Sequence, residues 1–153
     1  MKKEFLSTRI LHGAMVMGSL LFFVVVYFVF GIDKVVNAEP GTFDMFSYLI
    51  PIVVLSSILI AKMLDRNKLA SFDGEGGLKE KLFDYRVRVI IRSALTEGTA
   101  LFAVVAVLLT DDIIYALYFG IGWLALVYFR PNAAELSNDY NVTPQEEQEL
   151  QQD

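Results

Sequence analysis

Glu97 is the residue best placed to do chemistry, because it lies in the middle of a long apolar stretch of the chain. An ionisable group in such a stretch is costly to bury and is a candidate for binding a proton or a cation. Hydroxyl groups and one cation lie close to it in the sequence, on Arg92, Ser93, Thr96 and Thr99. We expect Glu97 either to bind a proton or a cation with these residues, or to accept hydrogen bonds that lock a bundle or an oligomer.

Other kinds of reaction centre have little support. The chain has no cysteine and a single histidine, His12, which argues against a thiolate nucleophile and a metal site. Neither a phosphate-binding loop nor a nucleophile elbow is found in the sequence. We therefore expect no catalytic residues, metal or cofactor, and no nucleic-acid partner.

The elements that must position Glu97 are long apolar helices. Hydrophobic residues make up 55% of the 153 residues and gather in four runs, at about 10–30, 46–64, 89–109 and 113–129. Each run has about the ~17–25 residues needed to cross a bilayer as a helix. Because Glu97 is eight residues past the start of the third run, it would lie roughly 12 Å deep. The fold class predicted is an all-α membrane protein, with a four-span bundle over 1–130.

Basic residues orient the bundle. Of the 13 lysines and arginines, 12 lie before the first run, in the stretch from Lys62 to Arg92 that joins the second and third runs, or after the fourth run. The positive-inside rule then places both termini and the loop 65–88 in the cytoplasm. Glycines at 74, 76 and 77 predict a flexible break in that loop. Leu78, Leu82 and Tyr85 after it share one helical face, which is typical of an amphipathic segment on the membrane surface. The simpler alternative, which we favour, is a stop-transfer charge cluster that only fixes the topology.

The first and third runs resemble each other when the sequence is shifted by 80 residues. Six of twelve positions coincide between residues 14–25 and 94–105. This indicates two duplicated helical hairpins, related by a pseudo-twofold axis along the membrane normal. Both copies carry two small residues four apart, a spacing that allows close helix packing: Ala14 and Gly18, Ala94 and Gly98. We expect the two runs to cross near the two glycines.

The segment 131–153 is a polar tail, predicted to be cytoplasmic. Thr143-Pro144-Gln145-Glu146 matches a capping box with proline at the first helical position, so a short helix over 144–151 is expected. We expect it to be a frayed, solvated end rather than a docking element.

The stretch from Leu95 to Leu109 locally resembles the ion-carrying helix of the rotary ATP synthase c-subunit, the proteolipid. That resemblance implies an ion-binding role for Glu97, with Thr99 as a neighbouring polar group and Phe102 as the aromatic residue. Neither of the first two runs shows the dense glycine repeat of that family. The whole chain looks more like a group of uncharacterised small four-span bacterial membrane proteins, which share the pattern A-L-x-E-G-x-A-L-F and an R-P exit, here Arg130-Pro131. This second resemblance implies the bacterial inner membrane.

Two functions remain open at this point. The first is a non-enzymatic bundle that contacts lipid and either self-assembles as a homo-oligomer or joins a larger membrane complex. The alternative is a component of a proton- or cation-coupled transporter or channel that uses Glu97.

Overall fold

The computed structural model describes residues 2–29, 45–72, 76–110 and 112–152, and these form helices without strands. Residues 30–44, which connect the first two apolar runs, and part of the glycine-rich break lie outside the described residues. The six helices, in chain order, are α1 (Lys2–Val29), α2 (Met45–Ala70), α3 (Leu78–Thr110), α4 (Ile114–Tyr128), α5 (Ala133–Tyr140) and α6 (Pro144–Gln152).

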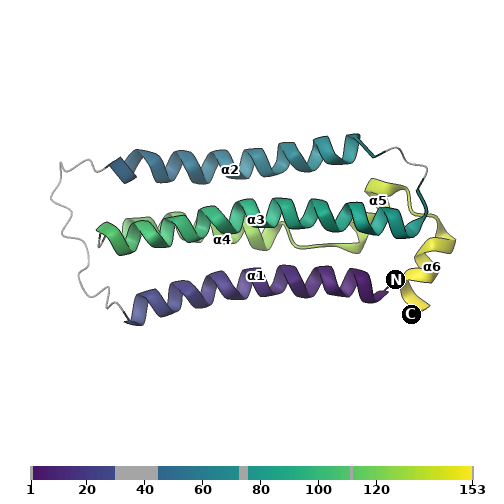
Figure 1. The fold of residues 1–153 in the computed structure, drawn as a ribbon, viewed down its shortest axis with the longest axis horizontal. Coiled ribbons are helices and arrows are strands. Elements are labelled where there is room, and N and C mark those ends of the chain that lie inside the picture. The colour runs from purple at the N-terminus through teal and green to yellow at the C-terminus, as the bar shows by residue number, and fades with distance from the viewer. Residues whose placement is uncertain (1, 30–44, 73–75, 111, 153) are drawn as a thin grey trace.

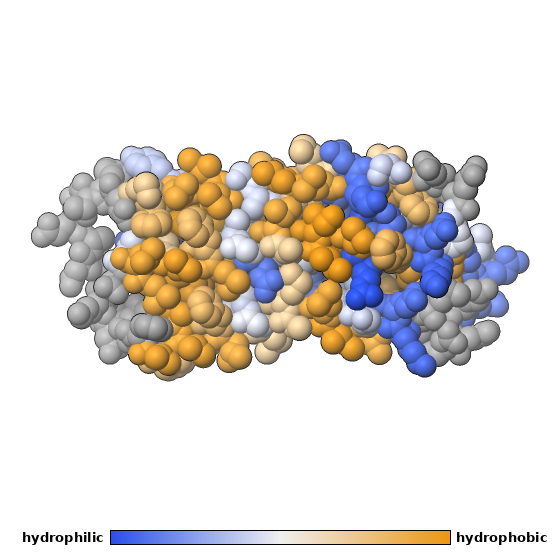
Figure 2. Space-filling model, in the orientation of Figure 1, coloured by the Kyte–Doolittle hydropathy of each residue, from blue (hydrophilic) through white to orange (hydrophobic). Residues whose placement is uncertain are grey.

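Four of the helices, α1 to α4, lie side by side in an elongated bundle, and α5 and α6 lie at one end of it (Figure 1). Helix α3 is central, since it packs against α1, α2 and α4. The N and C labels of Figure 1 lie at the same end of the bundle as α5 and α6. We call this the polar end, because most hydrophilic side chains of the visible face gather there, while hydrophobic ones dominate the remainder apart from a pale band with a small hydrophilic patch near the middle (Figure 2).

Three helices, α1, α2 and α3, are long and apolar enough to cross a membrane, and the number rises to four if α4 and α5 form one bent span. The fourth candidate differs from the others because α4 has only 15 residues, which is about 22 Å of helix. A bend of 64° separates its axis from the first part of α5. The prediction of an all-helical protein with helices long and apolar enough to span a membrane is therefore confirmed among the described residues.

Two clusters of buried apolar side chains hold the bundle together. The larger lies among all four long helices and includes alanines of α3 that let α2 and α4 approach closely: Ala100, Ala103 and Ala106. The smaller lies at the polar end and joins the start of α3 to α5 through Leu82, Tyr85, Leu136 and Tyr140. Such clusters are the contacts that fix helix positions, because lipid tails supply little hydrophobic force between helices.

Helices α1 and α3 run parallel and in register. The rings of Phe5 and Tyr85 stack with centroids 6.2 Å apart, and His12 Nδ1 lies 2.9 Å from Ser93 Oγ. These pairs are separated by 80 and 81 residues, close to the shift that relates the two apolar runs. Equivalent positions of α1 and α3 are thus neighbours near the polar end.

The predicted crossing at the two glycines is wrong for contacts within this chain. Ala14, Gly18, Ala94 and Gly98 are all exposed, and a Cβ atom added to either glycine would meet no atom within 4 Å. The reason is that these small residues do not lie on the faces by which α1 and α3 pack, which are other faces of the two helices. The close approach occurs instead between α3 and α4, where a Cβ on Gly122 would lie 3.1 Å from the Cβ of Ala100.

The polar segments are more ordered than the sequence suggests. Helix α2 continues to Ala70 and α3 begins at Leu78, so the predicted loop 65–88 is largely helical. Leu78, Leu82 and Tyr85 are buried on one face, as predicted. They belong to α3 itself and pack under the tail, rather than forming a separate helix on the membrane surface (Figure 1).

Candidate functional site

Glu97 lies on the flank of α3, between its buried and its exposed faces. Its side chain is partly buried, while Ala94 one turn earlier and Gly98 are exposed. No hydrogen bond or ion pair joins its carboxylate to any residue that the structure describes. Glu97 is therefore a carboxylate on a long apolar helix without a partner in the described part of its own chain.

The hydroxyl groups predicted to serve Glu97 have other partners. Ser93 pairs with His12, whose buried Nε2 has no hydrogen-bond partner in the described structure. Thr96 Oγ1 donates to the carbonyl oxygen of Arg92, at 2.9 Å, or to that of Ser93, at 3.1 Å. Thr99 pairs with Ser57 of α2 at 2.9 Å. Ser93 and Thr99 therefore tie α3 to α1 and α2, while Thr96 bonds within α3. None of these bonds forms an ion site around Glu97.

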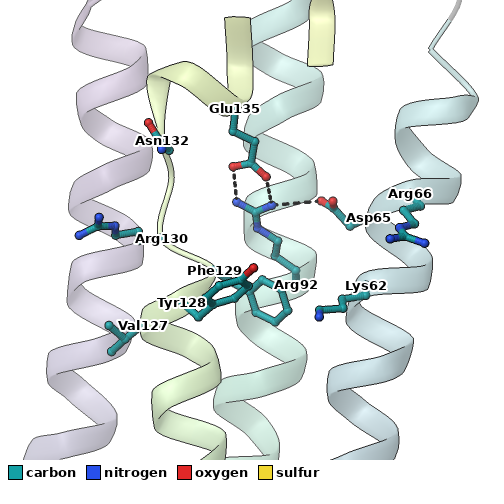
Figure 3. A pocket seen from close by; sticks show the side chains of 10 residues that line it. All are labelled: Lys62, Asp65, Arg66, Arg92, Val127, Tyr128, Phe129, Arg130, Asn132 and Glu135. Carbon is teal, nitrogen blue, oxygen red and sulfur yellow. Dashed lines mark hydrogen bonds and ion pairs between the residues drawn. The ribbon is translucent and has the colours of Figure 1, made fainter. Parts of the chain in front are cut away.

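Arg92 is also directed elsewhere, toward the tail (Figure 3). Its guanidinium group makes a two-armed ion pair with Glu135 of α5, with Nη2 donating to Oε2 at 2.8 Å. A longer contact of 3.4 Å reaches Asp65 of α2, and the group lies 5.7 Å from the ring centroid of Phe129. Arg92 is 3% exposed, so the pair with Glu135 is largely shielded from water.

Arg88, one turn before Arg92, makes the companion pair. Its Nε and Nη2 donate to the two carboxylate oxygens of Asp65 at 3.1 and 2.8 Å. Its Nη1 lies 2.8 Å from Asp139 Oδ2, and its guanidinium group lies 5.6 Å from the ring centroid of Tyr140. We call Arg88, Arg92, Asp65, Glu135 and Asp139 the arginine cluster. It joins α2, α3 and α5 with charge-assisted hydrogen bonds, which are the stronger kind.

Two tyrosines support the arginine cluster. Tyr85 donates to Glu135 Oε2 at 2.8 Å and accepts from the backbone N–H of Asn132, also at 2.8 Å. Asn132 in turn caps α5, because its side chain accepts from the N–H of Ala134. Tyr140 donates to Asp84 at 2.7 Å, and burial raises the pKa of its hydroxyl. The tail is therefore docked by specific contacts of α5, a helix not predicted from the sequence.

The arginine cluster was missed by sequence reasoning, although a signal for it exists. Arg88 and Arg92 are four residues apart on α3, and Glu135 and Asp139 are four residues apart on α5. Residues four apart share a helix face. Two complementary doublets therefore match when the helices meet, with Arg92 on Glu135 and Arg88 on Asp139.

Helix α6 begins with the predicted capping box. The N–H of Thr143 donates to Glu146 Oε2 at 2.8 Å, and the N–H of Glu146 lies 3.4 Å from Thr143 Oγ1. Lys81 of α3 adds an ion pair to Glu146 at 3.0 Å. The hydrogen bond from the Thr143 backbone, followed by the Lys81 ammonium group, holds the pKa of Glu146 below its ordinary value of 4.5.

We expect the carboxyl of Glu146 to titrate below its ordinary pKa in a pH titration followed by NMR in detergent micelles. Because its folded pKa is lowered, its contribution to stability is fully present above the ordinary value and is lost as pH falls through the lower, folded value. Lys81→Met should raise the midpoint of the Glu146 titration, since it removes the ammonium group, and Lys81 is one of the two residues that lower this pKa. Lys79→Met, at an exposed position of the same helix, should leave it unchanged. A midpoint at or above 4.5 in the unaltered protein would contradict the docking of α6 on α3.

Comparison of the chain with models of protein families, with curated proteins and with solved structures gave no significant match.

Proposed function

We propose that this protein is a non-enzymatic, multi-pass membrane protein that assembles through α3 with a second membrane-spanning helix. The observation that carries the proposal is the unpartnered carboxylate of Glu97. A polar group at that depth is costly when it faces lipid, and neighbouring helices commonly satisfy such groups by hydrogen bonds. The described part of the chain does not supply this partner, so a helix of another subunit is the natural source.

The face beside Glu97 suits close contact with another helix. Ala94 and Gly98 are exposed there, and small side chains allow helix backbones to approach. A second copy of the chain is the simplest occupant, because two parallel α3 helices would bring two Glu97 carboxyls together. A protonated carboxyl group both donates and accepts hydrogen bonds, so such a pair can satisfy itself. A helix of a larger membrane complex that carries a donor at the same depth would serve equally.

The proposed location is the bacterial inner membrane, with four spans and with the polar end in the cytoplasm. Support comes from the basic residues, which gather at the polar end as the positive-inside rule requires of a cytoplasmic face. The in-register packing of α1 on α3 supports the duplication of a helical hairpin, because related helices then make equivalent contacts.

Replacement of Glu97 tests the proposal. In mild detergent, Glu97→Leu should weaken association by about three- to thirty-fold, the range expected for one interhelical hydrogen bond in a membrane. Glu97→Gln, which keeps an acceptor and adds a donor, should weaken it less. The measurement is the mass of the protein–detergent complex by light scattering over a dilution series. Met17→Leu is the matched control, since Met17 is exposed and holds the equivalent position of α1.

The rival function, coupled transport through Glu97, makes a different prediction for the same variants. Both Glu97→Leu and Glu97→Gln would then abolish proton or cation flux into proteoliposomes, while the mass of the complex stayed the same. That combination of results would overturn the assembly proposal.

A further inference from the structure

A cavity of about 650 Å³ opens at the polar end, between the ends of α2 and α4 (Figure 3). Its volume lies within the ~300–1,000 Å³ common for small-ligand sites. Basic side chains from three elements line it: Lys62 and Arg66 of α2, Arg92 of α3, and Arg130 after α4. It lies beside the arginine cluster and shares Asp65, Arg92 and Glu135 with it.

The cavity carries an excess of positive charge. Its two acids, Asp65 and Glu135, are already bound to Arg88 and Arg92. Lys62, Arg66 and Arg130 form no ion pair with any residue in the described ranges. In addition, the buried Nε of Arg92 has no hydrogen-bond partner there. A ligand with negative charge and several acceptor oxygens would satisfy these donors.

The position of the cavity indicates that the ligand is an amphiphile. Lys62 lies within the last turn of the apolar run of α2, and Arg130 follows the apolar helix α4 by two residues. Val127, Tyr128 and Phe129 provide apolar lining, and the Lys62 ammonium lies 5.9 Å from the ring centroid of Tyr128. Aromatic and basic residues side by side are typical of the membrane–water boundary, where lipid headgroups lie.

We propose that this cavity binds the phosphate group of an anionic membrane lipid. Lys62, Arg66 and Arg130 would contact the phosphate oxygens, and the apolar lining would contact the upper part of the acyl chains. Basic pockets between membrane helices on the cytoplasmic side are suited to such headgroups. The inference does not depend on assembly through Glu97, because the cavity is lined by Arg92 on the buried side of α3, whereas Ala94 and Gly98 lie on its exposed side.

The test uses the full chain, delipidated in dodecyl maltoside and mixed with equimolar dioleoyl phosphatidylglycerol and dioleoyl phosphatidylcholine. Native mass spectrometry reports which lipid stays bound. The unaltered protein should retain phosphatidylglycerol in preference to phosphatidylcholine. The double variant Lys62→Gln/Arg66→Gln should lose about thirty-fold of that preference, at ~1 kcal/mol for each removed cation. Both side chains are exposed, so the bundle should keep its helicity.

A matched control separates the cavity from general surface charge. Lys3→Gln/Arg9→Gln removes one lysine and one arginine from exposed positions of α1 at the polar end, outside the cavity. It should retain the preference for phosphatidylglycerol. An equal loss in both double variants would overturn the proposal. Complete displacement of the lipid by millimolar sodium phosphate would also overturn it, by showing that the site takes free phosphate.

Discussion

Arg88→Ala is expected to lower the free energy of unfolding by about 3–5 kcal/mol and to release the C-terminal tail. Arg88 is 2% exposed and pairs with both Asp65 and Asp139. Removing one partner of a buried ion pair leaves the other charge buried and uncompensated, which accounts for the size of the effect. Unfolding by dodecyl sulfate in mixed micelles, followed by circular dichroism, measures the change. Limited proteolysis after residue 130 measures the release of α5.

Arg86→Ala is the matched control for this prediction. Arg86 lies two residues earlier on α3 and makes no ion pair with the described residues. Its replacement should change stability by less than about 1 kcal/mol, because the side chain is only partly buried and has no ion-pair partner to leave uncompensated. Equal losses in the two variants would show that the arginine cluster does not hold the tail. The triple variant Arg88→Met/Asp65→Leu/Asp139→Leu should recover much of the stability, because it leaves no unpaired charge.

Gly122→Leu is expected to destabilise the bundle by about 1–3 kcal/mol through overpacking. A Cβ at this position would lie 3.1 Å from the Cβ and 3.3 Å from the Cα of Ala100, so part of the obstacle is backbone. A leucine there must push α4 away from α3, which loosens the larger apolar cluster. The measurement is the midpoint of unfolding in the same mixed micelles.

Gly120→Leu provides the comparison within the same helix. A Cβ at Gly120 meets no atom within 4 Å, so the leucine there can turn toward lipid. Both replacements gain about 1 kcal/mol of helix propensity over glycine, and this gain cancels in the comparison. If Gly120→Leu destabilises as much as Gly122→Leu, the close contact of α3 with α4 is not where the structure places it.

The sequence predicts the helices of this protein well because each depends on local pattern. Apolar runs of sufficient length indicate α1, α2 and α3, and the capping box at Thr143 indicates the start of α6 to the residue. The buried face of Leu78, Leu82 and Tyr85 follows from helical spacing in the same way. Each of these features depends on residues close together in the chain, so a short stretch of sequence is enough to predict it.

Contacts between helices are harder to predict, because several faces of an apolar helix have similar composition. Ala94 and Gly98 have the spacing of a packing motif, yet Ala100 and Ala103 make the buried contacts of α3. Small residues permit close approach without requiring it. Which face of α3 becomes buried depends on all the side chains that meet across the helix contacts, such as Thr99 with Ser57 and Ala100 with Gly122.

In the candidate site, too, local features are predicted from the sequence and contacts between distant residues are not. The sequence singles out Glu97 as a carboxylate in an apolar run, but the partners expected for it pair with other groups in the structure. The pairing of Arg92 depends on the return of the tail, which joins residues 43 positions apart in the chain. No pattern near Arg92 reveals which distant acid it meets, although the spacing of Glu135 and Asp139 narrows the choice once the tail is known to dock.

The length of α3 has a mechanical consequence. Its 33 residues span about 50 Å, whereas the hydrocarbon core is about 30 Å thick. A helix of this length that crosses a bilayer leaves about 20 Å outside the acyl chains, and the tail binds α3 beside that portion through Arg88. Because α3 is one unbroken helix, a sideways force on the tail would also displace Glu97. Movements of the tail and of the part of α3 that carries Glu97 are therefore coupled.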